Sequence, residues 1–230
     1  MSQQDRFKEA AAEAAAALLE DGMVVGLGSG TTASMAVAAI GKRVAQGLKI
    51  VGIPTSELTA SQARSLNIPL STLEERPAID VTIDGADEVE KGTLHLIKGG
   101  GGNLLREKIV AVASARMIVV ADQSKVVSQL GSGFVIPVEV IPFGWQTTEQ
   151  RLQKVGAHPK LRLRPDGQTF ISDGGHFILD CAYGPIPKPA ELQRELDSIV
   201  GLVEHGLFIG IACQAIVGGP DGVTTLHRTA

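Results

Sequence analysis

Residues 83–108 read IDGADEVEKGTLHLIKGGGGNLLREK and join a strand, a glycine run and a helix. At the start of this stretch and in the residues just before it, Ile79, Val81 and Ile83 alternate with polar residues. This alternation predicts a strand that ends at Asp84. The carboxyl ends of strands form the ligand-binding edge of an open α/β sheet. The pattern therefore predicts an α/β fold with Asp84 at the mouth of a site.

Four consecutive glycines, at positions 99–102, lie between Lys98 at the end of an apolar run and an apolar helix start at Leu104. Glycines let successive backbone N–H groups converge on one point, and a helix N-terminus adds partial positive charge. The alternative is a flexible connector with solvated charges around it. Because the run is short and anchored at both ends, we favour an anion cradle.

A second glycine turn, GSGTTA at residues 28–33, follows a strand at 23–27 and precedes a helix that extends to about Gln46. It matches the G-x-G-x-x-A dinucleotide fingerprint, which alone is a weak signal. A dinucleotide site also needs an acid at the end of the second strand, but residues 48–53 continue into Pro54, Thr55 and Ser56. An NAD-dependent oxidoreductase is therefore disfavoured.

The hydroxyls of Ser29, Thr31 and Thr32 instead suit a single phosphate beside the start of the helix. Ordinary N-capping by one of them is the alternative. Lys125 follows the strand at 117–121 and is predicted to reach the same sheet edge, although it could also be a solvated surface lysine.

The order of elements along the chain predicts a Rossmann-like α/β fold. After an alanine-rich helix at 5–20, strands and helices alternate to residue 121, with further strands at 79–83 and 93–97. This order favours a mostly parallel sheet with helices on both faces. From Gly131 onward the order strand, helix, strands, helix, strand, with one of the strands at 161–164, predicts a smaller α+β insertion of ferredoxin-like type. The predicted domains are residues 1–130 with 206–230, and residues 131–205.

Composition narrows the class of protein. The 230 residues are 44% hydrophobic with a formal net charge of -4, which suits an α/β enzyme and gives no indication of nucleic-acid binding. Two cysteines without CxxC spacing predict a reducing, cytoplasmic location. Neither a signal-peptide pattern nor a membrane-spanning run is present, and the five dispersed histidines predict no metal site.

Four motifs identify a resemblance: GLGSGTTA at 26–33, DGADE at 84–88, KGGGGNLLREK at 98–108 and VEVIPFGW at 138–145. The chain resembles the ribose-5-phosphate isomerase family of type A over nearly its whole length. Two departures from the family pattern are visible. The usual G-T-G-S-T reads GSGTT at 28–32, which exchanges hydroxyl types without losing any, and Asn103 replaces a common Ala.

The resemblance implies interconversion of ribose 5-phosphate and ribulose 5-phosphate through a cis-enediolate, in the pentose phosphate pathway, without a cofactor. It implies that Glu107 is the proton acceptor and that sugar phosphate contacts the following residues: Lys8, Ser29, Gly30, Thr31, Thr32, Asp84, Gly85, Ala86, Asp87, Lys98, Gly99, Gly100, Gly101 and Lys125. The place of Lys8 follows from its distance along the chain from Thr32.

The chemistry agrees with these residue types. Asp84 is our choice for the acid/base group of ring opening, and Glu107 for the proton transfer between C1 and C2. Lys98 and the glycine amides would stabilise the enediolate oxygen, while Asp87 would hold hydroxyls or orient Lys98. The helix N-terminus and Lys98 are expected to keep Glu107 ionised at neutral pH.

Two further expectations concern partners. A non-catalytic regulator that binds sugar phosphates is the alternative function, although the acid–base residues are all present and no DNA-binding segment is predicted. Neither nucleic acid nor a membrane is expected as a partner. A homodimer or homotetramer is predicted from the family and from apolar residues beside the strands of the insertion. These residues are Phe134, Ile136, Ile141, Phe143 and Trp145.

Overall fold

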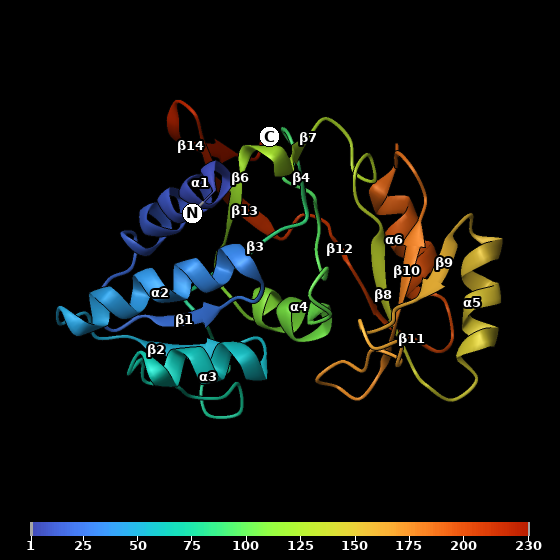
Figure 1. The fold of residues 1–230 in the computed structure, drawn as a ribbon, viewed down its shortest axis with the longest axis horizontal. Helices are drawn as coiled ribbons and strands as arrows, with labels where there is room; N and C mark the ends of the chain where they lie inside the picture. Colours follow the sequence, from blue (N-terminus) through green and yellow to red (C-terminus); the bar gives the residue numbers. More distant parts are fainter. Residues whose placement is uncertain (1, 230) are drawn as a thin grey trace.

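A six-stranded sheet forms the centre of the larger of two lobes in the computed structural model, which describes residues 2–229 (Figure 1). Its strands are β1 (Val24–Leu27), β2 (Val51–Pro54), β3 (Val81–Gly85), β6 (Met117–Asp122), β13 (Ala212–Gly219) and β14 (Gly222–His227). The strand order is β14-β13-β6-β3-β1-β2, and every neighbouring pair is parallel except the β13–β14 hairpin. The predicted mostly parallel sheet is confirmed.

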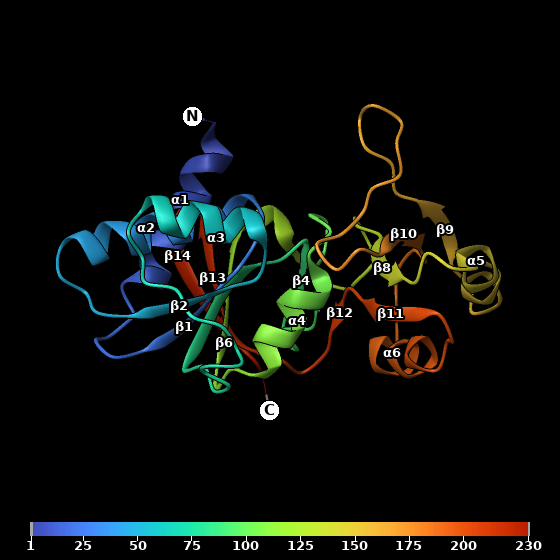
Figure 2. The same cartoon turned by 90° about the horizontal axis from the view of Figure 1, so that it is seen from below.

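Helices cover both faces of this sheet because its strands, apart from the edge strand β14, are apolar on both sides. Helices α1 (Gln3–Ala16), α2 (Thr31–Ala45) and α3 (Glu57–Ser65) lie on one side, and α4 (Leu104–Val112) lies on the other (Figure 2). Within β1, Val25 packs into the core formed with α1 and α2, whereas Val24 packs with Val110 of α4. The sheet is thus fixed from both faces.

The sheet changes its winding direction at β1, which pairs with β2 on one side and β3 on the other. The chain leaves the carboxyl end of β1 at Gly28, whose N–H donates to the carbonyl of Ile83 in β3 (3.0 Å). Such a switch point is where open α/β sheets bind ligands. The turn after β1 and the end of β3 therefore lie side by side at the expected edge.

A separate four-stranded sheet, of order β12-β5-β4-β7, lies between the lobes. Its strands are β4 (Glu88–Glu90), β5 (Leu96–Ile97), β7 (Val126–Val127) and β12 (Leu207–Phe208). The sequence predicts a strand of the main sheet at 93–97, and this is wrong. Gly92 and Leu94 have positive φ, so the chain turns back and only Leu96–Ile97 pairs, antiparallel to β4 and β12.

The smaller lobe is an antiparallel sheet of order β11-β8-β10-β9 with two helices. Its elements are β8 (Ile136–Val140), α5 (Trp145–Lys154), β9 (His158–Leu161), β10 (Phe177–Ala182), α6 (Pro189–Asp197) and β11 (Leu202–His205). If the four strands are numbered by their order in the chain, their order across the sheet is 4-1-3-2. The predicted ferredoxin-like fold of the insertion is confirmed. Its exact limits at 131 and 205 stay a prediction.

One strand of this lobe is shifted from its expected place. The sequence predicts a strand at 161–164, but β9 spans His158–Leu161 and includes Pro159. Proline is tolerated there because β9 is an edge strand, where a missing N–H need not break the sheet. Among the described residues, no helix is both long and apolar enough to cross a bilayer.

Candidate active site

A small cavity of about 60 Å³ lies where the β1–α2 turn, the end of β3, the glycine run and α4 meet. Its lining residues are Ser29, Gly30, Thr31, Thr32, Gly85, Ala86, Asp87, Lys98, Gly99, Gly100, Gly101 and Glu107. The sequence predicts every one of them as a site residue. Three other predicted residues, Asp84, Lys8 and Lys125, do not line the cavity.

Lys98 forms the electrostatic centre of the site. It follows β5, is only 2% exposed, and its Nζ donates to the carbonyl of Gly85 at 2.6 Å. The same Nζ lies 2.9 Å from Oδ2 of Asp84 and 3.2 Å from Oε2 of Glu107. Burial alone would lower the pKa of Lys98, but the two carboxylates outweigh it and raise the pKa. Lys98 is therefore a permanent buried cation.

Glu107 lies in the first turn of α4 and lines the cavity together with Gly99, Gly100 and Gly101. The residue is 3% exposed, and the charged group that meets its Oε2 is the ammonium of Lys98 at 3.2 Å. Burial raises the pKa of this carboxyl to about 8, although Lys98 acts in the opposite direction. The expected full ionisation at neutral pH is thus wrong, because removal of water outweighs the nearby positive charge.

Asp84 lies one layer behind the cavity wall. Its Oδ1 accepts hydrogen bonds from the N–H groups of Ser29 (3.0 Å) and Gly85 (2.7 Å), and its Oδ2 contacts Lys98. A Cβ at Gly28 would lie 2.2 Å from Oδ1, so only glycine permits this approach. Asp84 is fully buried, and burial raises its pKa against the effect of Lys98. Asp84 therefore does not line the cavity itself but contacts Lys98, which does.

Asp87 is the carboxylate of the DGAD motif that reaches the cavity. Its Oδ2 accepts from the N–H of Gly100 at 2.8 Å, which ties it to the glycine run. The N–H groups of Gly99 and Gly101 have no acceptor within residues 2–229. The cavity therefore offers a carboxylate, a buried ammonium and free backbone donors to one small ligand.

The start of α2 is open to an anion. Its N-cap is Gly30, and no side chain caps the helix, so ordinary capping by Ser29, Thr31 or Thr32 is excluded. The first N–H groups of a helix have no partner within it. Together with the hydroxyls of exposed Thr31 and half-buried Thr32, they can bind a phosphate.

Ser29 differs from the other two hydroxyl residues. Its Oγ lies 2.6 Å from Oγ1 of Thr55 and donates to Oγ of Ser56 at 2.9 Å, in a buried cluster that also contains Thr59. The hydroxyl of Ser29 is therefore engaged by the protein, behind the turn that it shapes. Sequence reasoning missed this cluster, although Thr55 and Ser56 directly follow β2 at the same sheet edge.

Lys8 and Lys125 lie near the end of β6. Nζ of Lys125 is 5.8 Å from the centre of the Phe134 ring. Burial alone would raise the pKa of Asp122, but hydrogen bonds from Ser124 and Gln4 and the nearby charge of Lys8 lower it. The structure does not bring either lysine to the cavity wall, and their phosphate contacts stay predictions.

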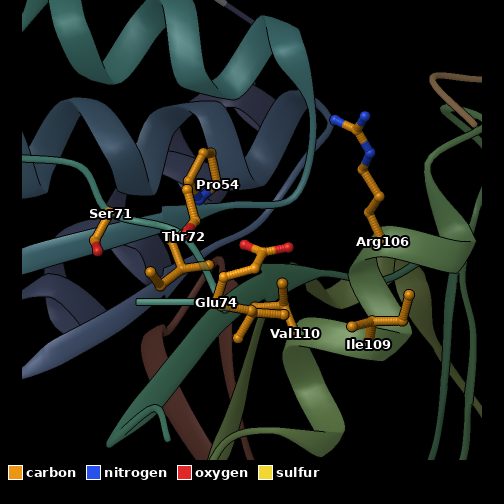
Figure 3. Close-up of a pocket in the computed structure, with 9 residues that line it drawn as sticks. Pro54, Ser71, Thr72, Glu74, Arg106, Ile109 and Val110 are labelled. Carbon is orange, nitrogen blue, oxygen red and sulfur yellow. The ribbon is translucent and has the colours of Figure 1, made fainter. Parts of the chain in front are cut away.

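A larger cavity of about 440 Å³ lies on the far side of α4 (Figure 3). Ile109 and Val110 of α4 form one wall of it, and Pro54 and the segment 71–74 form the other. Its charged residues are Glu74 and Arg106, and Arg106 is paired with Glu57 at 2.9 Å. Size alone therefore does not identify the reactive site, because this cavity has no comparable group of acid and base.

The family model for ribose 5-phosphate isomerase A (phosphoriboisomerase A) matches residues 51–222. The chain belongs to this family. It is 53% identical over 230 residues to ribose-5-phosphate isomerase A of Synechococcus sp. (strain JA-3-3Ab), covering 100% of both chains. It is 55% identical over 226 residues to the enzyme of the same name from Gloeobacter violaceus, covering 98% of each.

Solved structures of the family have the same fold. The ribose 5-phosphate isomerase A of Methanocaldococcus jannaschii matches with a TM-score of 0.92 and 40% identity, covering 96% of this chain and 98% of that one. A D-ribose-5-phosphate isomerase solved in complex with phospho-erythronic acid matches with a TM-score of 0.95 and 37% identity. That match covers 99% of this chain and 100% of the other.

Proposed function

We propose that this chain interconverts D-ribose 5-phosphate and D-ribulose 5-phosphate through a cis-enediolate. The observation that carries the proposal is the position of Glu107, a buried carboxylate that lines one cavity with the glycine run and has Nζ of Lys98 at 3.2 Å from its Oε2. A pKa near 8 suits a group that must both accept and return a proton near neutral pH. Membership of the family, and the sugar-acid complex of one of its solved members, support the same reaction.

The phosphate binds at the open start of α2. The free N–H groups of its first turn and the hydroxyls of Thr31 and Thr32 provide donors, and the helix dipole favours the negative charge. Lys8 and Lys125 add positive charge near the neighbouring end of β6. From this seat the sugar carbons extend into the cavity toward Glu107.

Ring opening needs a group that removes the proton of the C1 hydroxyl and returns one to the ring oxygen. Asp87 is the better candidate, because it lines the cavity whereas Asp84 is fully buried behind it. This changes the role that the sequence suggests for Asp84. We assign to Asp84 the positioning of Lys98, through the ion pair at 2.9 Å.

Proton transfer then follows on the open-chain aldose. The Glu107 carboxylate removes the proton from C2, and the electron pair of that bond moves to form the enediolate, with negative charge on O1. Lys98 and the free N–H groups of Gly99 and Gly101 stabilise this charge. The proton of the O2 hydroxyl passes to O1, and Glu107 returns its proton to C1 as the C2 carbonyl of the ketose forms.

The decisive experiment compares turnover of ribose 5-phosphate by the wild-type protein and by Glu107→Gln. The amide keeps the shape of the side chain but cannot accept the proton, so kcat is expected to fall by roughly 10²–10⁴. Affinity for 4-phospho-D-erythronate should survive, because the phosphate seat is unchanged. Near-wild-type turnover in Glu107→Gln would disprove the role of Glu107 as the base.

A regulator that binds sugar phosphates without turnover has no support from the family comparisons. Two finer expectations remain part of the proposal. The two free cysteines support a reducing compartment such as the cytoplasm. Assembly as a homodimer or homotetramer is supported by exposed apolar residues of the smaller lobe, of which Phe143 is 94% exposed.

A further inference from the structure

The smaller lobe contributes an arginine to the back of the glycine run. Arg162 immediately follows β9, and Nη1 of its side chain donates to the carbonyls of Gly99 (3.2 Å) and Gly100 (3.0 Å). The side chain is only 14% exposed. One guanidinium from the inserted lobe thus binds two successive peptide carbonyls of the catalytic loop.

This guanidinium is itself held in place. Its Nε donates to Oδ2 of Asp180 in β10 at 2.9 Å, and its Nη2 pairs with Oδ1 of the same carboxylate. It also lies 5.7 Å from the centre of the Phe170 ring, which packs against Gly102 at the end of the glycine run. A bidentate pair of this kind fixes both the position and the plane of the guanidinium.

Because the peptide bond is planar and trans, the binding of a carbonyl by Arg162 also fixes the direction of the next N–H group in the glycine run. In each peptide unit the C=O of one residue and the N–H of the next point in opposite directions. Binding of the Gly99 carbonyl by Arg162 therefore turns the N–H of Gly100 away from Arg162, and that N–H donates to Asp87 in the cavity. By the same geometry, binding of the Gly100 carbonyl turns the N–H of Gly101 away from Arg162.

We propose that Arg162 is a positioning residue for the isomerisation, which aims the N–H groups of Gly100 and Gly101 at Asp87 and at the enediolate oxygen. The inference rests on the proposed function. It gives the inserted lobe a part in catalysis, since the side chain that orients the donors lies outside the Rossmann-like lobe. Arg162 does not touch the substrate itself.

The test measures kcat, KM and affinity for 4-phospho-D-erythronate in wild type, Arg162→Ala and Arg162→Lys. Loss of one oriented donor lowers turnover by about 10²–10³ in other enzymes. Because Arg162 acts through the peptide, we expect kcat to fall about 10–100-fold in Arg162→Ala and less in Arg162→Lys. KM for ribose 5-phosphate should change less than about threefold, since the phosphate seat is untouched, and affinity for the sugar acid should fall with kcat.

Two controls separate positioning from a general loss of structure. Arg164→Ala removes an exposed arginine two residues away that makes no side-chain hydrogen bond in the described chain, and it should leave kcat unchanged. Millimolar guanidinium ion should restore part of the activity of Arg162→Ala, because the small cation can fill the vacated site. A variant that has merely lost stability would not be rescued.

The outcomes are distinct. Wild-type kcat in Arg162→Ala would overturn the inference and leave the proposed function intact. A parallel loss of kcat and thermal stability without guanidinium rescue would also overturn it, in favour of a purely structural role. Absence of ribose 5-phosphate turnover in the wild-type protein would overturn the proposed function, and the inference with it.

Discussion

At the residue scale, the proposed mechanism makes the protonation state of Glu107 the factor that sets the pH range of activity. Its pKa is raised to about 8 by burial, and only the deprotonated form can accept the C2 proton. We expect kcat/KM to rise about tenfold per pH unit below the pKa and to level off above about 8. A pH–rate profile measures this directly. An acid limb near pH 4 to 5 would show that the carboxylate behaves as an exposed one.

The raised pKa of Glu107 also makes the free energy of unfolding depend on pH. The pKa of Glu107 is higher in the folded chain than its ordinary value of 4.5, so the native state binds more protons than the unfolded state between these values. The contribution of protonated Glu107 to the free energy of unfolding is fully present below about pH 4.5 and is lost as the pH rises through about 8. Burial of the ionised carboxylate therefore destabilises the protein in alkaline solution.

We expect Glu107→Gln to raise Tm relative to wild type at pH 9, and the difference to vanish toward pH 4.5. Each kcal/mol should correspond to about 2–4 °C for a chain of this size. Thermal unfolding across this pH range is the measurement, with Glu20→Gln at an exposed carboxylate as the control. An equal Tm difference at both pH values would contradict the assigned titration.

At the element scale, the hydroxyl cluster behind the β1–α2 turn predicts how phosphate affinity depends on buried groups. Oγ1 of Thr59 donates to the carbonyl of Gly28 at 3.0 Å and accepts from Ser56 at 2.9 Å. Thr59→Val keeps the shape but leaves these buried groups short of partners, which should cost about 1–3 kcal/mol of unfolding free energy.

Because Gly28 begins the turn that leads to the phosphate seat, Thr59→Val should also raise KM for ribose 5-phosphate more than it lowers kcat. Steady-state kinetics and chemical denaturation measure the two effects. Thr225→Val, on the exposed face of β14, is the matched control and should change neither. An unchanged KM in Thr59→Val would remove the cluster from the support of the phosphate seat.

Elements with a strong periodic pattern are those that the sequence predicts well. The apolar β6, for example, is expected at residues 117–121 and found at Met117–Asp122. The strand β14 has no counterpart in the prediction, because it is mostly exposed and carries threonines instead of an apolar run. Helix α1 ends at Ala16, before Leu18, although its alanine-rich pattern favours an extension to residue 20.

The site is predictable to the extent that it lies in local motifs. Most residues of the two glycine turns line one cavity with Glu107, as their placement at strand ends and a helix start indicates. The pKa of Glu107 is not predictable in this way, since it depends on how completely the folded chain removes water. Arg162 is equally hidden from sequence reasoning, because its contact with Gly100 spans 62 positions.

At the scale of the whole molecule, the structure narrows the proposed assembly surface. Ile136, Phe134 and Trp145 pack within the core of the smaller lobe, while Ile141 and Phe143 stay exposed. We expect light scattering to give twice the 24.0 kDa chain mass or more at micromolar concentration, and Phe143→Asp to weaken the assembly. A wild-type monomer of 24.0 kDa would contradict this expectation.

The chain passes between the two lobes twice, and the two passages lie next to each other. The N–H of Gly206, where the chain returns, donates to the carbonyl of Pro137, where it has just left, at 2.8 Å, and the carbonyl of Gly206 accepts from the N–H of Lys98 at 2.9 Å. With entry and exit hydrogen-bonded to each other, a recombination event could exchange the whole smaller lobe between homologous genes at two breakpoints that are far apart in the sequence but adjacent in the fold. Such a chimera would inherit Lys98 and Gly206 from one parent and Pro137, which is hydrogen-bonded to Gly206, from the other.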